Sequence, residues 1–183
     1  KQIAPGIHEL TIDAVTHPLP GKQATGLARK LGNDIACELL NAGHIKTPLL
    51  CNTDADAVLP PDYFARLTRA HAAGLNRKPR TTALVLPFMH KSEDPVLQEA
   101  GVTYELYLRS LQLNLQRCGS PYAYPALGSV LAVSPIDYAK SRGFPKRRAG
   151  EDFYLLNKLA KLGQVHYLTG APVILAARAS HRV

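Results

Sequence analysis

Two aspartates separated by one residue end a short apolar run in the stretch LLCNTDADAVLPP, residues 49–61. Like charges this close repel each other unless a cation lies near them. Carboxylate oxygens are hard ligands that suit Mg²⁺ or Mn²⁺, and such an ion usually binds substrate phosphate as well. Asp54 and Asp56 are therefore candidate metal ligands, although Asp is also common in ordinary solvated turns.

A second acidic pair, Glu151-Asp152, follows Gly150 and opens a stretch with helical apolar spacing. A carboxylate at this position interacts favourably with the helix dipole, which is a purely structural role. A carboxylate can also remove the proton of a hydroxyl nucleophile. Without further information both interpretations of Glu151 and Asp152 stay open.

The segments around the two acidic pairs resemble family 2 glycosyltransferases of the A-type (nucleotide-diphospho-sugar transferase) fold, over roughly Gln23 to Val183. The first block consists of ARKLG (28–32), DAD (54–56) and PPD (60–62). Lys30 stands where the family usually has Asn. The second block consists of a Gly-Ser strand start (128–129), GFP (143–145) and the acidic pair (151–152). Two motif blocks in the right order are more specific than either block alone.

The resemblance implies a metal-dependent transfer of sugar from a nucleotide-diphosphate sugar to an acceptor hydroxyl. It also implies that the configuration at the sugar is inverted and that a carboxylate is the base. It implies that Asp56 ligates Mn²⁺ or Mg²⁺, while Asp54 holds the ribose or a metal-bound water. His181 resembles the place where some relatives supply a third metal ligand. The donor nucleotide, the sugar and the acceptor are not specified by these motifs.

By the same similarity Asp152 is the base and Glu151 a supporting contact to the acceptor or the donor sugar. Gly128 and Ser129 are small where the donor sugar approaches the backbone. The basic residues Arg147 and Arg148 can fold over a diphosphate, or can simply be solvated. Arg29 can meet donor phosphate or coat a helix.

Two other function classes compete with this interpretation. The stretch DADAV also resembles haloacid-dehalogenase-like phosphatases, with Asp54 as nucleophile and Asp56 as acid/base. That chemistry also requires a downstream lysine and a further acidic pair on a later loop. A net charge of +8 is compatible with a nucleic-acid-binding domain. The basic residues are scattered, however, and no aromatic-basic signature is present, so we expect no nucleic-acid partner.

Alternating strand and helix patterns predict the elements that must position these residues. Apolar spacing and breakers indicate strands at 8–15, 48–52, 81–89, 127–133 and one or two within 165–177. Helices are indicated at 23–41, 61–74, 96–118, 135–141 and 150–162, where 96–118 is one long helix or two that are broken near Gly101. We expect strand 48–52 to be buried on both faces. This alternation predicts a single α/β domain over residues 1–183, with a mainly parallel mixed sheet flanked by helices.

Composition sets the remaining limits. The 183 residues are 46% hydrophobic and 20% charged, as in ordinary globular domains. Three widely spaced cysteines favour a reducing compartment, and no run reaches the roughly 18 apolar residues of a transmembrane helix, so a cytoplasmic location is expected. The resembled family opens with two strands that hold the nucleotide base, and nothing before Gln23 is similar to them. We therefore expect the natural chain to extend upstream of Lys1.

Overall fold

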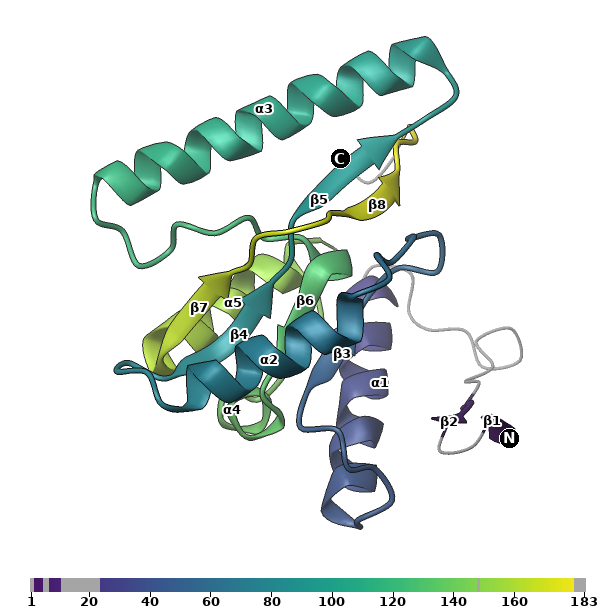
Figure 1. Ribbon diagram of the computed structural model, residues 1–183, viewed down its shortest axis with the longest axis vertical. Helices are drawn as coiled ribbons and strands as arrows, with labels where there is room; N and C mark the ends of the chain where they lie inside the picture. The colour runs from purple at the N-terminus through teal and green to yellow at the C-terminus, as the bar shows by residue number, and fades with distance from the viewer. Residues whose placement is uncertain (1, 5–6, 11–23, 148, 180–183) are drawn as a thin grey trace.

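The computed structural model describes residues 2–4, 7–10, 24–147 and 149–179, which form an α/β structure around a mixed sheet. In the central sheet the strand order is β3-β6-β4-β7 (Figure 1). Helices lie on both faces: α2 (Tyr63–Leu75) covers one face, and α5 (Glu151–Leu162) covers the other. The four strands are β3 (Leu50–Asn52), β4 (Thr81–Val85), β6 (Leu131–Val133) and β7 (Gln164–Tyr167).

The sheet is not mainly parallel, which corrects the sequence-based expectation. β6 runs antiparallel to both β3 and β4, and only β4 and β7 are parallel. The reason lies in the connection between β4 and β6. The chain re-enters the sheet at the end where β4 finishes, with Val85 opposite Leu131, whereas a parallel strand requires a crossover to the opposite end.

The single strand predicted over 81–89 is two strands in different sheets. β4 ends at Val85, and β5 (Phe88–Lys91) pairs in parallel with β8 (Val173–Ala176) in a separate two-stranded sheet. Pro87 lies between β4 and β5 and has no backbone N–H to donate to a continuing ladder. The long helix α3 (Pro95–Arg117) packs on β5, away from the central sheet (Figure 1).

Helix positions agree with the sequence patterns. The remaining helices are α1 (Ala24–Asn41) and α4 (Pro135–Lys140), and with α2, α3 and α5 they fall within a few residues of the predicted bounds. Pro95 and Pro135 each occupy the first turn of a helix, where a missing N–H costs nothing.

Strand predictions were less accurate at the edges of the fold. The stretch predicted as strand 127–133 begins as a 3₁₀ turn, η1 (Gly128–Val130), before β6. β3 is buried on one face only, because Cys51 is exposed. The strand expected at 8–15 overlaps the short hairpin of β1 (Gln2–Ala4) and β2 (Ile7–His8) at His8 alone, and residues 11–15 lie outside the described residues.

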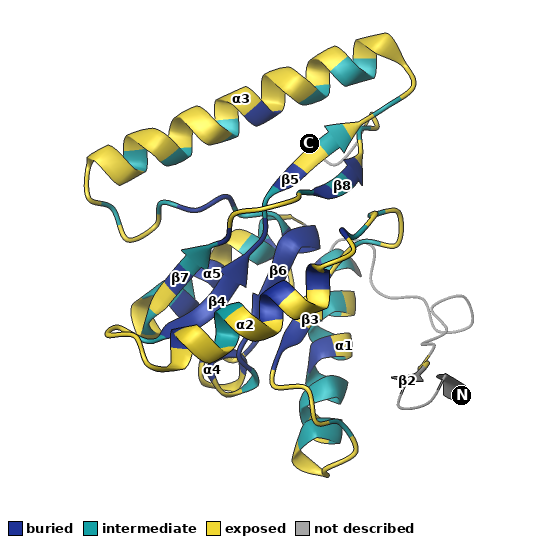
Figure 2. Ribbon diagram, in the orientation of Figure 1, coloured by how far each residue is buried: buried dark blue, intermediate teal, exposed yellow. Residues whose placement is uncertain are grey.

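The core lies between the central sheet and α5. Strands β4 and β6 are buried along their whole length, and Leu155, Leu156 and Leu159 of α5 pack against them with no exposed surface (Figure 2). Phe144, from the Gly-Phe-Pro segment, is buried in the same cluster. None of the helices in the described part of the chain combines the length and the apolarity needed to cross a bilayer.

Candidate functional site

A single arginine joins carboxylates from two distant parts of the chain. Arg29 of α1 donates from Nη2 to Asp54 Oδ1 at 2.7 Å, and from Nη1 to Glu151 Oε1. The side chains of Arg29 and Glu151 are only 16% and 5% exposed, so solvent screens their attraction weakly. The cation that neutralises Asp54 in this structure is therefore a guanidinium group that also binds the second acidic pair.

The Gly-Ser segment, in η1, completes the cluster as its fourth part. Ser129 Oγ donates to Asp54 Oδ2 at 2.6 Å, and the Gly128 backbone N–H donates to Asp152 Oδ2 at 2.8 Å. A Cβ atom at Gly128 would lie 1.8 Å from Arg29 Nη1. Glycine is required at this position because the guanidinium occupies the space of a side chain. The structure thus brings Arg29 and Asp54 into one cluster with the Gly-Ser segment and the second acidic pair.

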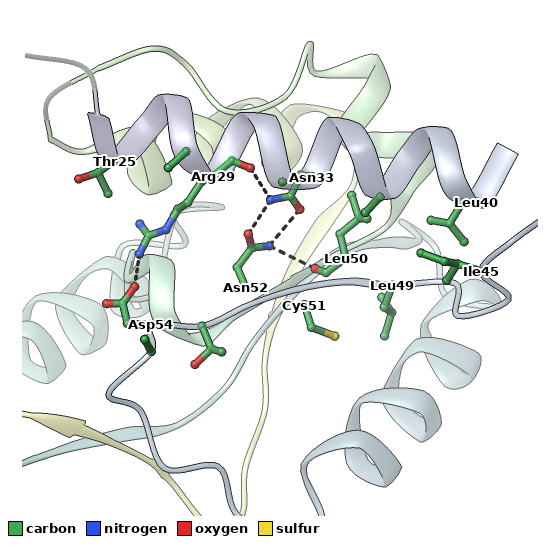
Figure 3. A pocket seen from close by; sticks show the side chains of 15 residues that line it. Thr25, Arg29, Asn33, Leu40, Ile45, Leu49, Leu50, Cys51, Asn52 and Asp54 are labelled. Carbon is green, nitrogen blue, oxygen red and sulfur yellow. Dashed lines mark hydrogen bonds and ion pairs between the residues drawn. The ribbon is translucent and has the colours of Figure 1, made fainter. Parts of the chain in front are cut away.

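An amide pair one helical turn away sets the position of α1 against β3 (Figure 3). Asn33 Nδ2 donates to Asn52 Oδ1 at 2.7 Å and to the Arg29 carbonyl oxygen at 2.7 Å. Asn52 Nδ2 donates back to Asn33 Oδ1 and to the Leu50 carbonyl. Both asparagines are buried, so their hydrogen bonds are costly to break. The pair holds Arg29 at the height of Asp54.

Asp152 lies in the first turn of α5, and its local environment raises its pKa above the ordinary value. Gly150 precedes it with φ +71°, a conformation that glycine adopts without strain. Asp152 Oδ1 accepts from the Phe153 N–H at 2.7 Å. Burial raises the pKa of Asp152, and the charge of Glu151 adds to the rise, against the opposing effects of backbone hydrogen bonds and of Arg29. Asp152 is thus a stronger proton acceptor than an ordinary carboxylate.

The pKa of Asp54 is lowered instead of raised. Burial alone would raise the pKa of Asp54, but the Ser129 hydrogen bond and the Arg29 charge together outweigh burial and hold this pKa below its usual value. Two carboxylates of one site therefore differ in proton affinity. Burial and the charge of Glu151 raise the pKa of Asp152, whereas Ser129 and Arg29 outweigh burial at Asp54 and lower its pKa. Such divergence is typical of sites in which two acids have different tasks.

Asp56 has a separate arginine. Its Oδ2 accepts from Arg178 Nη1 at 2.7 Å, and both side chains are well exposed, at 36% and 64%. Within the described residues no group of three His, Cys, Asp or Glu side chains could hold a metal ion. Mg²⁺ and Mn²⁺ commonly need only one or two carboxylates when phosphates and water supply the other ligands. The donor set at Asp56 fits an ion that arrives with a diphosphate, and does not fit a closed protein cage.

Three candidate site residues remain, namely Arg147, Arg148 and His181. The Arg147 guanidinium lies 3.9 Å from the centre of the Tyr154 ring and so contacts an aromatic face at the start of α5. Its segment packs tightly on α1, because a Cβ at Gly26 would lie 2.5 Å from the Pro145 carbonyl oxygen. Arg148 and His181 lie outside the described residues.

Three residues of the site were not identified from the sequence. Arg178 binds Asp56. The only sequence feature that could have indicated it is that it lies in the same C-terminal stretch as His181. Asn33 follows Arg29 by one turn, a spacing that carries no chemical signal by itself. Tyr104 of α3 has a pKa raised by burial and, next, by the charge of Asp152, so it lies within electrostatic reach of that carboxylate. Only the fold reveals this last relation.

A cleft of about 910 Å³ opens between α1 and the outer edge of β3 (Figure 3). Its polar end contains Arg29 and Asp54, and its apolar end contains Leu40, Ile45 and Leu49. Among the described residues β3 has no strand neighbour on this side. The cleft gives open access to the Asp54 end of the cluster.

Comparison with protein-family models, with curated proteins and with solved structures gives no match for this chain.

Replacing Gly128 by alanine tests the close approach of Arg29. We expect Gly128→Ala to lower the free energy of unfolding by about 1–3 kcal/mol, the usual cost of forcing atoms into a packed site. Gly32→Ala is the matched control, because a Cβ at Gly32 meets nothing within 4 Å. The free energy of unfolding of Gly32→Ala should rise by about 0.5–1 kcal/mol, because alanine favours a helix more than glycine does. Denaturant unfolding measures both, and equal effects of the two variants would contradict the proposed contact.

The opposite pKa shifts of Asp54 and Asp152 predict a distinctive titration. Carboxyl ¹³C NMR should show Asp54 titrating below, and Asp152 above, the ordinary value of about 3.9. Since its folded-state pKa is lowered, Asp54 contributes stability above about pH 4 that is lost as the pH falls through the lowered value. The raised pKa of Asp152 has the opposite effect on stability. It stabilises the folded state at low pH, and this stabilisation is lost as the pH rises through the raised pKa.

Ser129→Ala is the control for this titration, because it removes one stabilising partner of the Asp54 carboxylate and leaves Asp152 untouched. The Asp54 midpoint should then rise while the Asp152 midpoint stays in place. Midpoints of Asp54 and Asp152 on the same side of the ordinary value would show that the two environments are not different.

Proposed function

We propose that this protein is a metal-dependent glycosyltransferase of the A-type fold that transfers a sugar from a nucleotide-diphosphate sugar to an acceptor hydroxyl. The supporting observation is the Arg29 cluster. Asp54 of the first motif block is 74 to 98 positions from the second block. It nevertheless shares one hydrogen-bonded network with the residues of that block, which are Gly128, Ser129, Glu151 and Asp152. A family resemblance based on two separate blocks requires them to meet in space.

Asp152 is the base in this proposal. Each of its oxygens accepts one backbone N–H, from Phe153 and Gly128, which fixes the orientation of the carboxylate. Each oxygen keeps lone-pair capacity for an acceptor proton. As the acceptor oxygen bonds to the anomeric carbon, the bond from that carbon to the diphosphate breaks and the acceptor proton passes to Asp152. Its raised pKa favours this transfer, since a base works best with a pKa near the working pH.

Glu151 has a different role. Its carboxylate is buried and committed to Arg29, so it is a poor candidate for accepting a substrate proton. We assign it as the residue that positions Arg29. The guanidinium group in turn orients Asp54, with Ser129 on its other oxygen, at the mouth of the cleft. In this arrangement Asp54 and Arg29 face the donor.

The leaving diphosphate needs positive charge, which a divalent ion bound at Asp56 would supply. Arg178 occupies one oxygen of Asp56, and because both side chains are exposed the pair can separate at small cost. Once released, Arg178 is an additional cation for the same phosphates. Arg147 contacts the ring of Tyr154 near the N-terminal end of α5, the end that also contains Asp152.

The phosphatase alternative explains less of the geometry. It would use Asp54 as the nucleophile, but both Asp54 oxygens accept hydrogen bonds, one from a guanidinium that lowers nucleophilicity along with the pKa. It also leaves the raised pKa of Asp152 without a task. The transferase proposal assigns a role to both acids.

Asp152→Asn is the principal test of the proposal. It keeps the shape of the side chain and removes the proton acceptor, so transfer should fall by at least about 100-fold. Donor affinity, measured by calorimetry with a panel of nucleotide sugars and Mn²⁺, should stay within about threefold. Loss of donor binding would place Asp152 on the donor side, and near-normal turnover would leave it a helix-terminal acid. A larger rate loss in Glu151→Gln would exchange the two roles.

Asp56→Ala tests the metal ligand. We expect calorimetry to show Mn²⁺-dependent binding of a nucleoside diphosphate to the natural protein, weakened at least about tenfold in the variant. Asp62→Ala is the matched control, because Asp62 is also exposed and also pairs with an arginine, Arg66 at 2.8 Å. Equal binding by both variants would show that Asp56 holds no ion.

A further inference from the structure

Helix α3 is almost entirely solvent-exposed, although its sequence is not that of an exposed helix. Of its 23 residues only Glu105 is buried, and the helix packs on the rest of the described chain mainly through β5 (Figure 2). Its only charged residues are Glu99, Glu105, Arg109 and Arg117. Exposed apolar residues occur along its whole length, and contiguous apolar surface of this kind marks an interaction site.

The inner face of α3 is well anchored, so the helix is not a loosely attached segment. Glu105 accepts hydrogen bonds from His90 N and from His90 Nδ1 at 3.1 Å, and Arg109 Nη1 contacts its other oxygen at 2.8 Å. Arg109 also donates to the Phe88 carbonyl at 3.0 Å. The outward surface of α3 is therefore held in a fixed orientation.

One outward stripe has the spacing of a helix–helix seam. Ala100, Tyr104, Tyr107 and Leu111 follow each other at intervals of four, three and four residues, the spacing of apolar positions in helices that pack side by side. Tyr107 is 63% exposed and lies near the middle of the helix. Beside this stripe runs a shallow groove of about 520 Å³, which Glu99 also lines. Hereafter these four residues are the α3 seam.

The charges beside the seam identify the partner. Glu99 and Arg117 are separated by 18 residues, which is about five full turns, so they lie on the same side of the helix. No ion-pair partner is found for either within the described chain. In an antiparallel pair of identical helices equivalent flanks face each other. Glu99 lies about 12 Å before Tyr107 and Arg117 about 15 Å after it along the helix axis. A twofold axis near Tyr107 therefore places each Glu99 beside the Arg117 of the other copy.

We propose that two copies of this chain associate through antiparallel packing of their α3 seams, with Tyr107 at the twofold axis and two symmetry-related Glu99–Arg117 ion pairs at the ends. The surface is self-complementary, as a twofold interface must be. The acidic residue lies toward the N-terminal end of the helix and the basic residue in its last turn. In a parallel pair the equivalent flanks lie on opposite sides of the seam, so Glu99 and Arg117 would not face each other. This inference does not depend on the proposed enzymatic function.

The test is the oligomeric state of the natural protein by sedimentation velocity and light scattering. Two-helix contacts are at the small end of specific interfaces, so concentrations from about 1 to 200 μM should be covered. A dimer that forms in this range supports the proposal. Tyr107→Glu places two like charges at the axis and should raise the dimer dissociation constant at least about tenfold.

Phe64→Glu is the matched control, because Phe64 is an aromatic residue that is 67% exposed and belongs to α2 instead of α3. It should leave the dimer intact. Circular dichroism of both variants checks that α3 stays folded. A monomer at every concentration, or dissociation by Phe64→Glu and not by Tyr107→Glu, would overturn the proposal. A monomeric protein that binds anionic vesicles through the seam would also overturn it, in favour of a lipid surface.

Charge exchange tests the antiparallel orientation. Glu99→Arg and Arg117→Glu should each weaken the dimer, since each sets like charges at both ends of the seam. The double variant Glu99→Arg/Arg117→Glu restores opposite charges and should return the dissociation constant to within about threefold of the natural value. Failure of the double variant to recover, with both single variants impaired, would reject the antiparallel register.

Discussion

The ion pair of Arg29 with Asp54 and Glu151 is the interaction on which the site depends. Glu151 is almost completely buried, and breaking a buried pair by removing one partner typically costs about 3–5 kcal/mol. The pair also fixes geometry, because α1, the end of β3 and the start of α5 meet at this guanidinium. Gly128 contributes by having no side chain, and Asn33 contributes by holding the Arg29 turn of α1 against β3.

This arrangement separates the properties of two carboxylates that lie in one network. Asp54 accepts hydrogen bonds from a serine hydroxyl and from the Arg29 guanidinium, which outweigh its burial, so its pKa falls. At Asp152 burial and the negative charge of Glu151 outweigh the backbone N–H groups and Arg29, so its pKa rises. One acid is thereby suited to a permanent negative charge, and the other to exchange of a proton. Burial of the cluster is what allows such small differences in partners to have large electrostatic effects.

Away from the cluster the molecule is built differently. The central sheet and α5 form a packed core that keeps the site rigid, while β5, β8 and α3 form an outlying layer with one anchored face and one exposed face (Figures 1 and 2). Glu105 anchors α3 from inside, and Tyr104 extends from the same helix to within electrostatic reach of Asp152. Association through α3 would therefore bring a second copy close to the site without changing the residues that form it.

The sequence by itself determined the helices, the α/β class and the residues that gather at the site, because helical periodicity, proline and glycine breakers and short motifs are local signals. It did not determine the direction of β6, which depends on where a long connection returns to the sheet. Nor did it indicate that Arg29 binds Asp54 and Glu151 together, or that Arg178 binds Asp56. Those pairings join residues up to 122 positions apart, and only tertiary packing decides which distant charges become neighbours.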